Sequence, residues 1–168
     1  KCWMAENLNY GDSVYWALSQ TDNCKVEKYC AGNLTSQCAI SGGFYQWNEL
    51  MQYQNNEGGQ GICPPGWHVP SLQEWNNLEN ACRGPGLAGD QLKDQGTYYG
   101  FHALMSGFFY SGHLWSFSSG ASSGIMFWTS TLHSPLSAHA RGLNQINPSL
   151  SFYSSGIDNG FPVRCVRD

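Results

Sequence analysis

The sequence has little charge: only 12% of its 168 residues are Asp, Glu, Lys or Arg, about half the share that is usual in soluble proteins. With a net charge of -4 it lacks the basic face that nucleic-acid binding requires, so no nucleic-acid partner is expected. No apolar run approaches the roughly 20 residues of a membrane span, so membrane insertion is not expected either. No signal peptide is visible at the opening residues Lys1-Cys2-Trp3, and we expect an export signal upstream of this chain.

The missing charge is concentrated in the second half of the sequence. From Gln95 to Ala140 there is no Asp, Glu, Lys or Arg, so this stretch offers no carboxylates for a hard cation such as Ca²⁺. The second half as a whole is rich in Gly, Ser, Asn and His, and it also carries many of the aromatic residues that make up 14% of the chain. So many aromatic residues are not typical of disorder. We therefore interpret residues 1–168 as one domain with long ordered loops.

The cysteines indicate an oxidising compartment. No two of them stand at the C-x₂₋₄-C spacing of metal sites, and disulfides are the better interpretation. An odd number leaves one thiol free or intermolecular. The seven cysteines are Cys2, Cys24, Cys30, Cys38, Cys63, Cys82 and Cys165. Because disulfides form in oxidising compartments, we expect an extracellular or cell-surface protein.

Two helices and several strands are predicted. Apolar residues at 44, 47, 50 and 51 have helical spacing, and Ser71 with Glu74 forms a capping box that begins a second helix, which ends before Gly84. Residues 126–131 are rich in β-forming types, and residues 138–143 and 161–165 alternate in a half-buried pattern. Helices followed by strands predict an α+β domain.

Several short motifs resemble a known family. In order along the chain they are Trp3 to Leu8, Tyr45-Gln46-Trp47, Cys63-Pro64-Pro65-Gly66-Trp67-His68-Val69-Pro70-Ser71 with Glu74-Trp75, Trp128 to Thr131 and Val163 to Val166. Together they resemble the Fibrobacter succinogenes major paralogous domain, a family of exported bacterial domains. The helix start at Pro70 to Trp75 and the closing segment Gly160 to Asp168 also resemble, more distantly, the formylglycine-generating-enzyme group.

Both resemblances imply a C-type-lectin-like fold: two helices against a small twisted antiparallel sheet, adjacent termini and long ordered loops that carry ligands. Residues 24–43 depart from the simplest family pattern and are interpreted as an insertion that is stapled by its own disulfide. With this family resemblance, the disulfides that we expect are Cys30–Cys38 and Cys63–Cys165, with Cys2–Cys24 as a weaker guess.

No catalytic constellation is visible. His68 is interpreted as a structural histidine, and His133 and His139 lack a third metal ligand nearby. Cys82 is the best candidate for the leftover thiol, buried and inert. The active cysteine pair of the formylglycine-generating enzymes and the Glu-Pro-Asn, Gln-Pro-Asp and Trp-Asn-Asp motifs of calcium-dependent lectins are all absent. We expect no enzyme activity, no metal and no cofactor, although an oxidoreductase or hydrolase stays as a third hypothesis.

Residues 106–160 have the composition of an antibody paratope, in which aromatic side chains supply contact area and Ser, Gly and Asn supply adaptable hydrogen bonds. Phe108, Phe127 and Trp128 are expected in the core. The candidate ligand-binding residues are Tyr110, His113, Trp115, Phe117, His133, Asn144, Asn147, Phe152, Tyr153 and Asn159.

The hypothesis is a binding or adhesion module for a glycan or protein on another cell or surface. Variable proteins of diversity-generating retroelements use the same fold and are rich in the same residue types near the C-terminus, so such a role is a sharper variant. The alternative is a structural or assembly domain of a larger surface protein with no small ligand.

Overall fold

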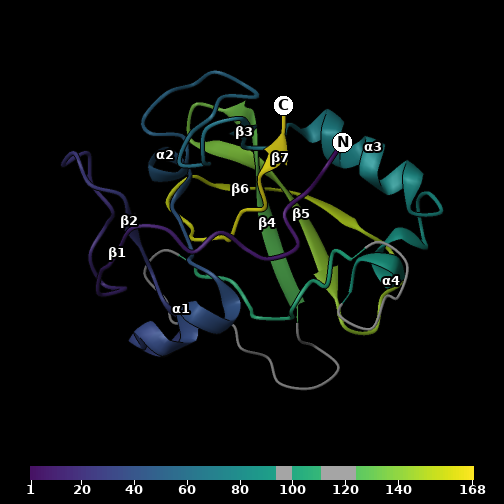
Figure 1. The fold of residues 1–168 in the computed structure, drawn as a ribbon, viewed down its shortest axis with the longest axis horizontal. Helices are drawn as coiled ribbons and strands as arrows, with labels where there is room; N and C mark the ends of the chain where they lie inside the picture. Colours follow the sequence, from purple (N-terminus) through teal and green to yellow (C-terminus); the bar gives the residue numbers. More distant parts are fainter. Residues whose placement is uncertain (94–99, 111–123) are drawn as a thin grey trace.

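The computed structural model describes residues 1–93, 100–110 and 124–168 (Figure 1). The helices in this part of the chain are a 3₁₀ turn η1 (Ala31–Asn33), α1 (Thr35–Ser41), α2 (Trp47–Leu50), α3 (Leu72–Ala81) and α4 (Ala88–Leu92). The strands are β1 (Asp12–Ser13), β2 (Glu27–Lys28), β3 (Trp67–His68), β4 (Gly124–Ser134), β5 (Ser137–Asn144), β6 (Ser151–Gly156) and β7 (Val166–Arg167). The α+β class is confirmed, and the arrangement is consistent with a C-type-lectin-like fold.

Helix α3 begins and ends where its sequence predicts. The Ser71 hydroxyl accepts a hydrogen bond from the Glu74 amide at 3.3 Å, and the Glu74 carboxylate accepts one from the Ser71 amide at 3.0 Å. These two bonds satisfy donors that the first turn of a helix leaves free. Gly84, with φ of 77°, donates to the Glu79 carbonyl at 2.9 Å and closes the C-terminal end.

The first predicted helix is shorter than its apolar spacing suggests. Phe44 and Tyr45 are not helical: their amides donate to the carbonyls of Tyr29 and Phe161, at 3.0 Å in both cases, and form isolated β-bridges. An amide used in a bridge cannot join a helical ladder, so α2 begins only at Trp47. The prediction of a helix over 44–51 was therefore wrong at its N-terminal end, although the apolar residues of that segment are buried as expected.

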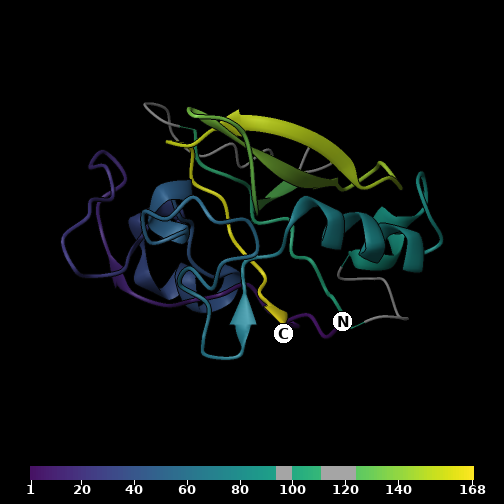
Figure 2. The same cartoon turned by 90° about the horizontal axis from the view of Figure 1, so that it is seen from above.

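The main sheet is antiparallel, in the order β4-β5-β6. The strands predicted at 126–131 and 138–143 lie within β4 and β5, whose register pairs Phe127 with Arg141 and Trp128 with Ala140. The third strand was not predicted: residues 151–156 were expected in a binding loop, but they form β6, with Arg141 opposite Phe152 and Ala140 opposite Tyr153. In Figure 2, β6 runs along the outer side of the molecule.

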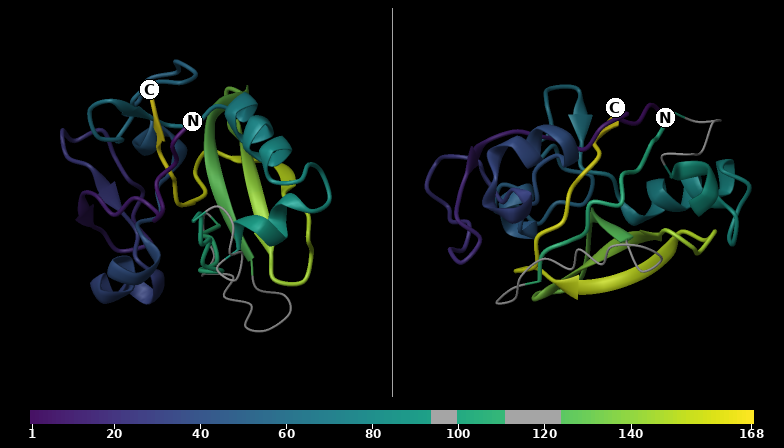
Figure 3. Two further views of the ribbon diagram at one scale, coloured as in Figure 1. Left: turned by 45° about the vertical axis from the view of Figure 1, so that its right-hand side comes forward. Right: turned by 90° about the horizontal axis from the view of Figure 1, so that it is seen from below.

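The sheet lies between two groups of helices and loops (Figure 3, left). On one face Phe127 packs with Trp75 of α3 and Leu92 of α4. On the other face Trp128 packs with Trp47 of α2. Phe127 and Trp128 are neighbours in β4 and are both 0% exposed, because successive side chains of a strand point to opposite faces. Core packing on both faces therefore fixes the position of β4.

The closing strand predicted at 161–165 is replaced by a looser arrangement. The carbonyls of Val163 and Cys165 accept hydrogen bonds from Leu8 and Met4 at 3.0 and 3.1 Å. Only Val166–Arg167 forms a strand, β7, which pairs antiparallel with β3. A β-bridge between Trp3 and Val166 and a hydrogen bond of 2.9 Å from the Arg167 amide to the Cys2 carbonyl hold the first and last residues of the sequence close together (Figure 1), as the resemblance implies.

Both main disulfide predictions are confirmed. Cys63–Cys165 joins the turn before α3 to the closing segment across 102 residues, and Cys30–Cys38 closes a loop of 8. The guess of a Cys2–Cys24 bridge was wrong, because both residues are free and exposed. Cys82 is the buried free thiol that the sequence indicated, and burial raises its pKa.

Candidate functional site

Three aromatic side chains of the predicted binding region are strongly exposed. Tyr110, Phe152 and Tyr153 are 43%, 52% and 41% exposed. The neighbouring Phe127 and Trp128 are 0% exposed, which confirms them as core residues. Phe108, the third expected core residue, is partly buried and packs against the core. Among the aromatic residues that the structure describes here, Phe127 and Trp128 are therefore core residues, and Tyr110, Phe152 and Tyr153 are available at the surface.

A row of three rings lies on one face of the sheet. The ring centroids of His133 and His139 are 5.1 Å apart, and those of His139 and Phe152 are 4.9 Å apart. We name these three residues the ring row. Burial and the neighbouring His133 both lower the pKa of His139, which favours the uncharged form of this imidazole. The ring row is therefore a largely apolar surface with polar ring atoms, a composition that suits stacking against a ligand.

Helix α3 is held beside the ring row by a buried ion pair. Arg141 of β5, which is 4% exposed, contacts Glu79 of α3 at 2.7 Å. The same guanidinium donates to the Asn76 side chain at 3.0 Å and to the Leu150 carbonyl at 3.2 Å. Because Arg141 is paired with Phe152 in the register of β5 and β6, these contacts set the helix position relative to the ring row.

Tyr153 lies on the other face of the sheet. It is paired with Ala140, and its ring approaches the backbone of Gly142 so closely that an added Cβ there would lie 2.6 Å from Cε2. Tyr110 stacks edge to face with Phe108, with centroids 5.1 Å apart. Phe152 and Tyr153 are adjacent in sequence but face opposite ways, so the structure does not bring all predicted binding residues together.

The predicted asparagines shape turns. The Asn144 side-chain oxygen accepts from the Ile146 amide at 3.0 Å, and that of Asn147 accepts from the Ser149 amide at 3.0 Å. Asn159 is buried and donates to the Ser155 hydroxyl at 2.8 Å. These amides hold loop conformations, as Asn commonly does. The remaining predicted binding residues, His113, Trp115 and Phe117, lie outside the described residues.

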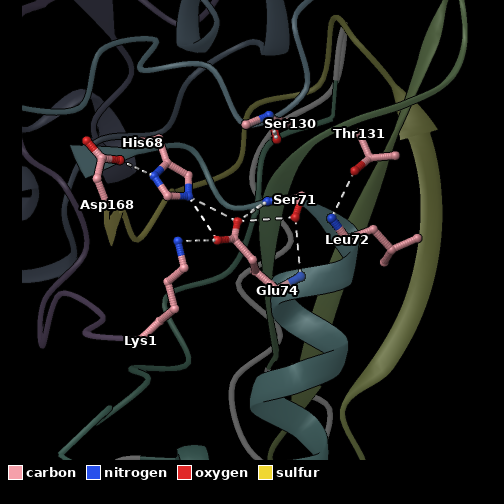
Figure 4. Close-up of polar contacts among 9 residues, drawn as sticks. Lys1, His68, Ser71, Leu72, Glu74, Ser130, Thr131 and Asp168 are labelled. Atoms are coloured by element: carbon pink, nitrogen blue, oxygen red, sulfur yellow. Dashed lines mark hydrogen bonds and ion pairs between the residues drawn. The ribbon is translucent and has the colours of Figure 1, made fainter. Parts of the chain in front are cut away.

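His68 occupies a polar network at the start of α3 (Figure 4). Its Nδ1 lies 2.5 Å from Asp168 and its Nε2 lies 3.0 Å from Glu74. Lys1 contacts the same Glu74 carboxylate at 3.3 Å. The network joins both ends of the sequence to the first turn of α3. This geometry agrees with the interpretation of His68 as a structural residue.

Sequence reasoning missed a hollow of about 420 Å³, which we name the polar hollow. Its wall comes from four parts of the chain: the segment between β1 and β2, the start of α2 with the turn that follows it, the turn between β4 and β5, and the residues after β6. No local motif marks it, because its residues are far apart in the sequence. They are Ser19, Gln20, Gln46, Asn48, Tyr53, Leu136, Ile157 and Asp158.

The described residues contain neither a membrane-spanning helix nor a cluster of metal-binding side chains. No helix among them is both long and apolar enough to cross a bilayer. No group of three or more His, Cys, Asp and Glu side chains in the same residues is placed to hold a metal ion.

The fold and its disulfides define a small α+β domain of the kind that forms in an oxidising environment. The chain belongs to the Fibrobacter succinogenes major domain family, whose model matches residues 1–167. This match confirms the resemblance that the motifs indicate. No curated protein and no solved structure matches the chain. The family description names no activity or ligand, so the function is argued from the geometry of the exposed surfaces.

Proposed function

We propose that this domain is a non-catalytic binding module of a secreted or cell-surface bacterial protein, and that it recognises a glycan or a protein on another cell or surface. The observation that carries the proposal is the exposure of Tyr110, Phe152 and Tyr153, between 41% and 52%, in a region with almost no charge. Exposed aromatic side chains surrounded by Ser, Asn and Gly are typical of recognition surfaces. The two disulfides support an extracellular location.

The test is a glycan and surface-protein array that is probed with the purified domain. Alanine at Phe152 should weaken binding through the ring row, and alanine at Tyr153 should weaken binding through the opposite face. A loss of about 2 kcal/mol or more, which is a factor of about 30, marks an aromatic hot spot. Tyr15→Ala is the matched control, because Tyr15 is 55% exposed and lies outside the region. If the two β6 variants bind an identified partner as well as the control does, the proposal is wrong.

The sharper variant is that the domain is the variable protein of a diversity-generating retroelement. Its support is the abundance of Asn, Ser, Tyr, Phe and His in the second half of the sequence. In that case residues of β5, β6 and their loops differ between copies, whereas the buried Phe127 and Trp128 do not. Sequencing the genomic neighbourhood tests this variant, because it requires an adjacent reverse transcriptase and a template repeat.

A structural or assembly role is the second candidate. It is favoured by β6, which is an edge strand of the sheet that the structure describes. From Ser151 to Gly156 it carries neither the charges nor the prolines that usually protect an edge from pairing with another chain. Pairing of two β6 edges would give a dimer. Sedimentation equilibrium of the wild type and of Ser154→Lys separates the two roles. A wild-type dimer that becomes monomeric in Ser154→Lys supports assembly, and a monomeric wild type argues against it.

A further inference from the structure

The polar hollow combines segments that are distant in sequence and fixes them by interlocking amides. The Gln46 amide donates to the Gln20 side-chain oxygen at 2.7 Å, and the Gln20 amide donates to the Gln46 side-chain oxygen at 3.0 Å. The Gln46 side chain also donates to the Asp158 carbonyl at 2.8 Å, and the Ile157 amide donates to the Leu136 carbonyl at 3.2 Å. The wall is thus built before any ligand arrives, which lowers the entropic cost of binding.

Several side chains in the polar hollow have hydrogen-bond donors or acceptors that are free to bind a ligand. The side chains of Ser19, Asn48 and Asp158 make no hydrogen bond to any residue that the structure describes. The Tyr53 hydroxyl donates to Glu49 at 2.8 Å, so its oxygen is left to accept. Asn48 offers donors and an acceptor, Ser19 offers one of each, and Asp158 offers acceptors only.

Apolar surface lies next to these groups. Leu136 is 76% exposed, and Ile157 is half-buried beside it in the wall. A volume of about 420 Å³ lies within the range of about 300–1,000 Å³ that is usual for small-molecule sites. A ligand that fits the polar hollow therefore needs hydroxyl groups, which both donate and accept hydrogen bonds, on one side and an apolar C–H surface on the other.

The charges near the polar hollow determine which ligands it disfavours. Asp158 stands in the wall, and the carboxylate of Glu49 is 0% exposed beneath Tyr53. No Lys or Arg is among the lining residues. An anionic ligand would therefore meet like charge without a counter-ion.

We infer that the polar hollow binds one unit of a neutral saccharide. The inference does not rest on the ring row or on Tyr153, because it uses different residues at the end of the sheet where β4 turns into β5. The sugar hydroxyls donate to Asp158 and Tyr53 and accept from Asn48 and Ser19. The C–H face of the sugar ring lies against Leu136 and Ile157.

The test is an amide NMR titration of the full chain with glucose, galactose, mannose and N-acetylglucosamine, each separately, and with glucuronate and the uncharged dipeptide acetyl-Ala-Ala-amide. At least one neutral sugar should shift the amides of Gln20, Gln46 and Ile157, with saturation in the millimolar range that is typical of such small ligands. Glucuronate and the dipeptide should not. Shifts by no sugar, shifts that map elsewhere, or equal shifts by the dipeptide would overturn the inference.

Four variants make the test specific. Asn48→Ala should weaken sugar binding about tenfold, which is the effect of losing one or two hydrogen bonds, whereas Asn55→Ala, an exposed asparagine outside the lining, should not. Asp158→Asn should allow glucuronate to bind. Phe152→Ala should leave the sugar-induced shifts unchanged, so that failure of the inference and failure of the proposed function are seen separately. Sugar binding that Asn48→Ala leaves intact contradicts the assignment.

Discussion

The ring of Tyr153 occupies the space that a side chain at Gly142 would need. A Cβ at Gly142 would lie 2.6 Å from Cε2 and 3.2 Å from Cδ2 of that ring. The backbone of Gly142 is not in the left-handed region, so the glycine is needed for space and not for its conformational freedom. The two residues belong to neighbouring strands, β5 and β6.

Gly142→Ala should therefore displace the Tyr153 ring and lower the free energy of unfolding by about 1 kcal/mol, at the lower end of overpacking effects because an edge strand can shift. Urea denaturation measures the change. In a Tyr153→Ala background the same substitution should cost little, since the ring is gone. Equal costs in both backgrounds would show that the ring does not restrict Gly142.

The buried pair Arg141–Glu79 should matter far more than an exposed one. Glu79→Ala leaves a guanidinium that is 4% exposed without its carboxylate, and we expect a loss of about 3–5 kcal/mol in the free energy of unfolding. Asp12→Ala breaks the Lys25–Asp12 pair, whose side chains are 70% and 73% exposed, and should cost less than about 1 kcal/mol. Similar losses in the two variants would contradict this account of how α3 is fixed to β5.

The sequence predicted correctly those structural elements that are determined by residues close to one another in the chain. The capping box of Ser71 and Glu74 placed the start of α3 to the residue, and the β-rich run at 126–131 marked β4. By contrast, Phe44 and Tyr45 have a helical spacing but bond to distant carbonyls. Tertiary hydrogen bonds overrode the local preference there, and no pattern within the segment reveals them.

The binding region shows the same limit. The composition of residues 151–156 indicates a polar loop with rings, yet these residues complete a sheet with β5. Phe152 and Tyr153 therefore point to opposite faces, which depends on strand formation and not on composition. The polar hollow could not be predicted, because Asn48, Leu136 and Asp158 meet only after folding.

The two disulfides should differ in their effect on stability. In the chain-entropy model the stabilisation grows with the length of the closed loop, and Cys63–Cys165 spans 102 residues whereas Cys30–Cys38 spans 8. Replacing Cys63 and Cys165 with serine should cost about 4.7 kcal/mol, and replacing Cys30 and Cys38 should cost about 2.5 kcal/mol. Thermal denaturation of both double variants tests the order, and a greater loss from the short loop would contradict it.

Acid should weaken the network at the start of α3. Burial acts to raise the pKa of Glu74, but hydrogen bonds from Ser71 and His68 outweigh it and hold this pKa below 4.5. A carboxylate whose pKa is lower in the folded than in the unfolded state stabilises the fold when it is ionised. Its contribution is therefore complete at neutral pH and is lost as the pH falls below 4.5 and through the folded-state pKa.

Glu74→Gln should remove that part of the pH dependence. Urea midpoints measured from neutral pH down to about pH 3 should fall less steeply for the variant than for the wild type, because the variant has no carboxylate to protonate at this site. The variant should also be less stable at neutral pH, where the wild type gains the contacts of Glu74 with Lys1 and His68. Asp22→Asn, which removes an exposed carboxylate, is the control and should change the slope less than Glu74→Gln does. A wild-type slope in Glu74→Gln would mean that acid lability arises elsewhere in the chain.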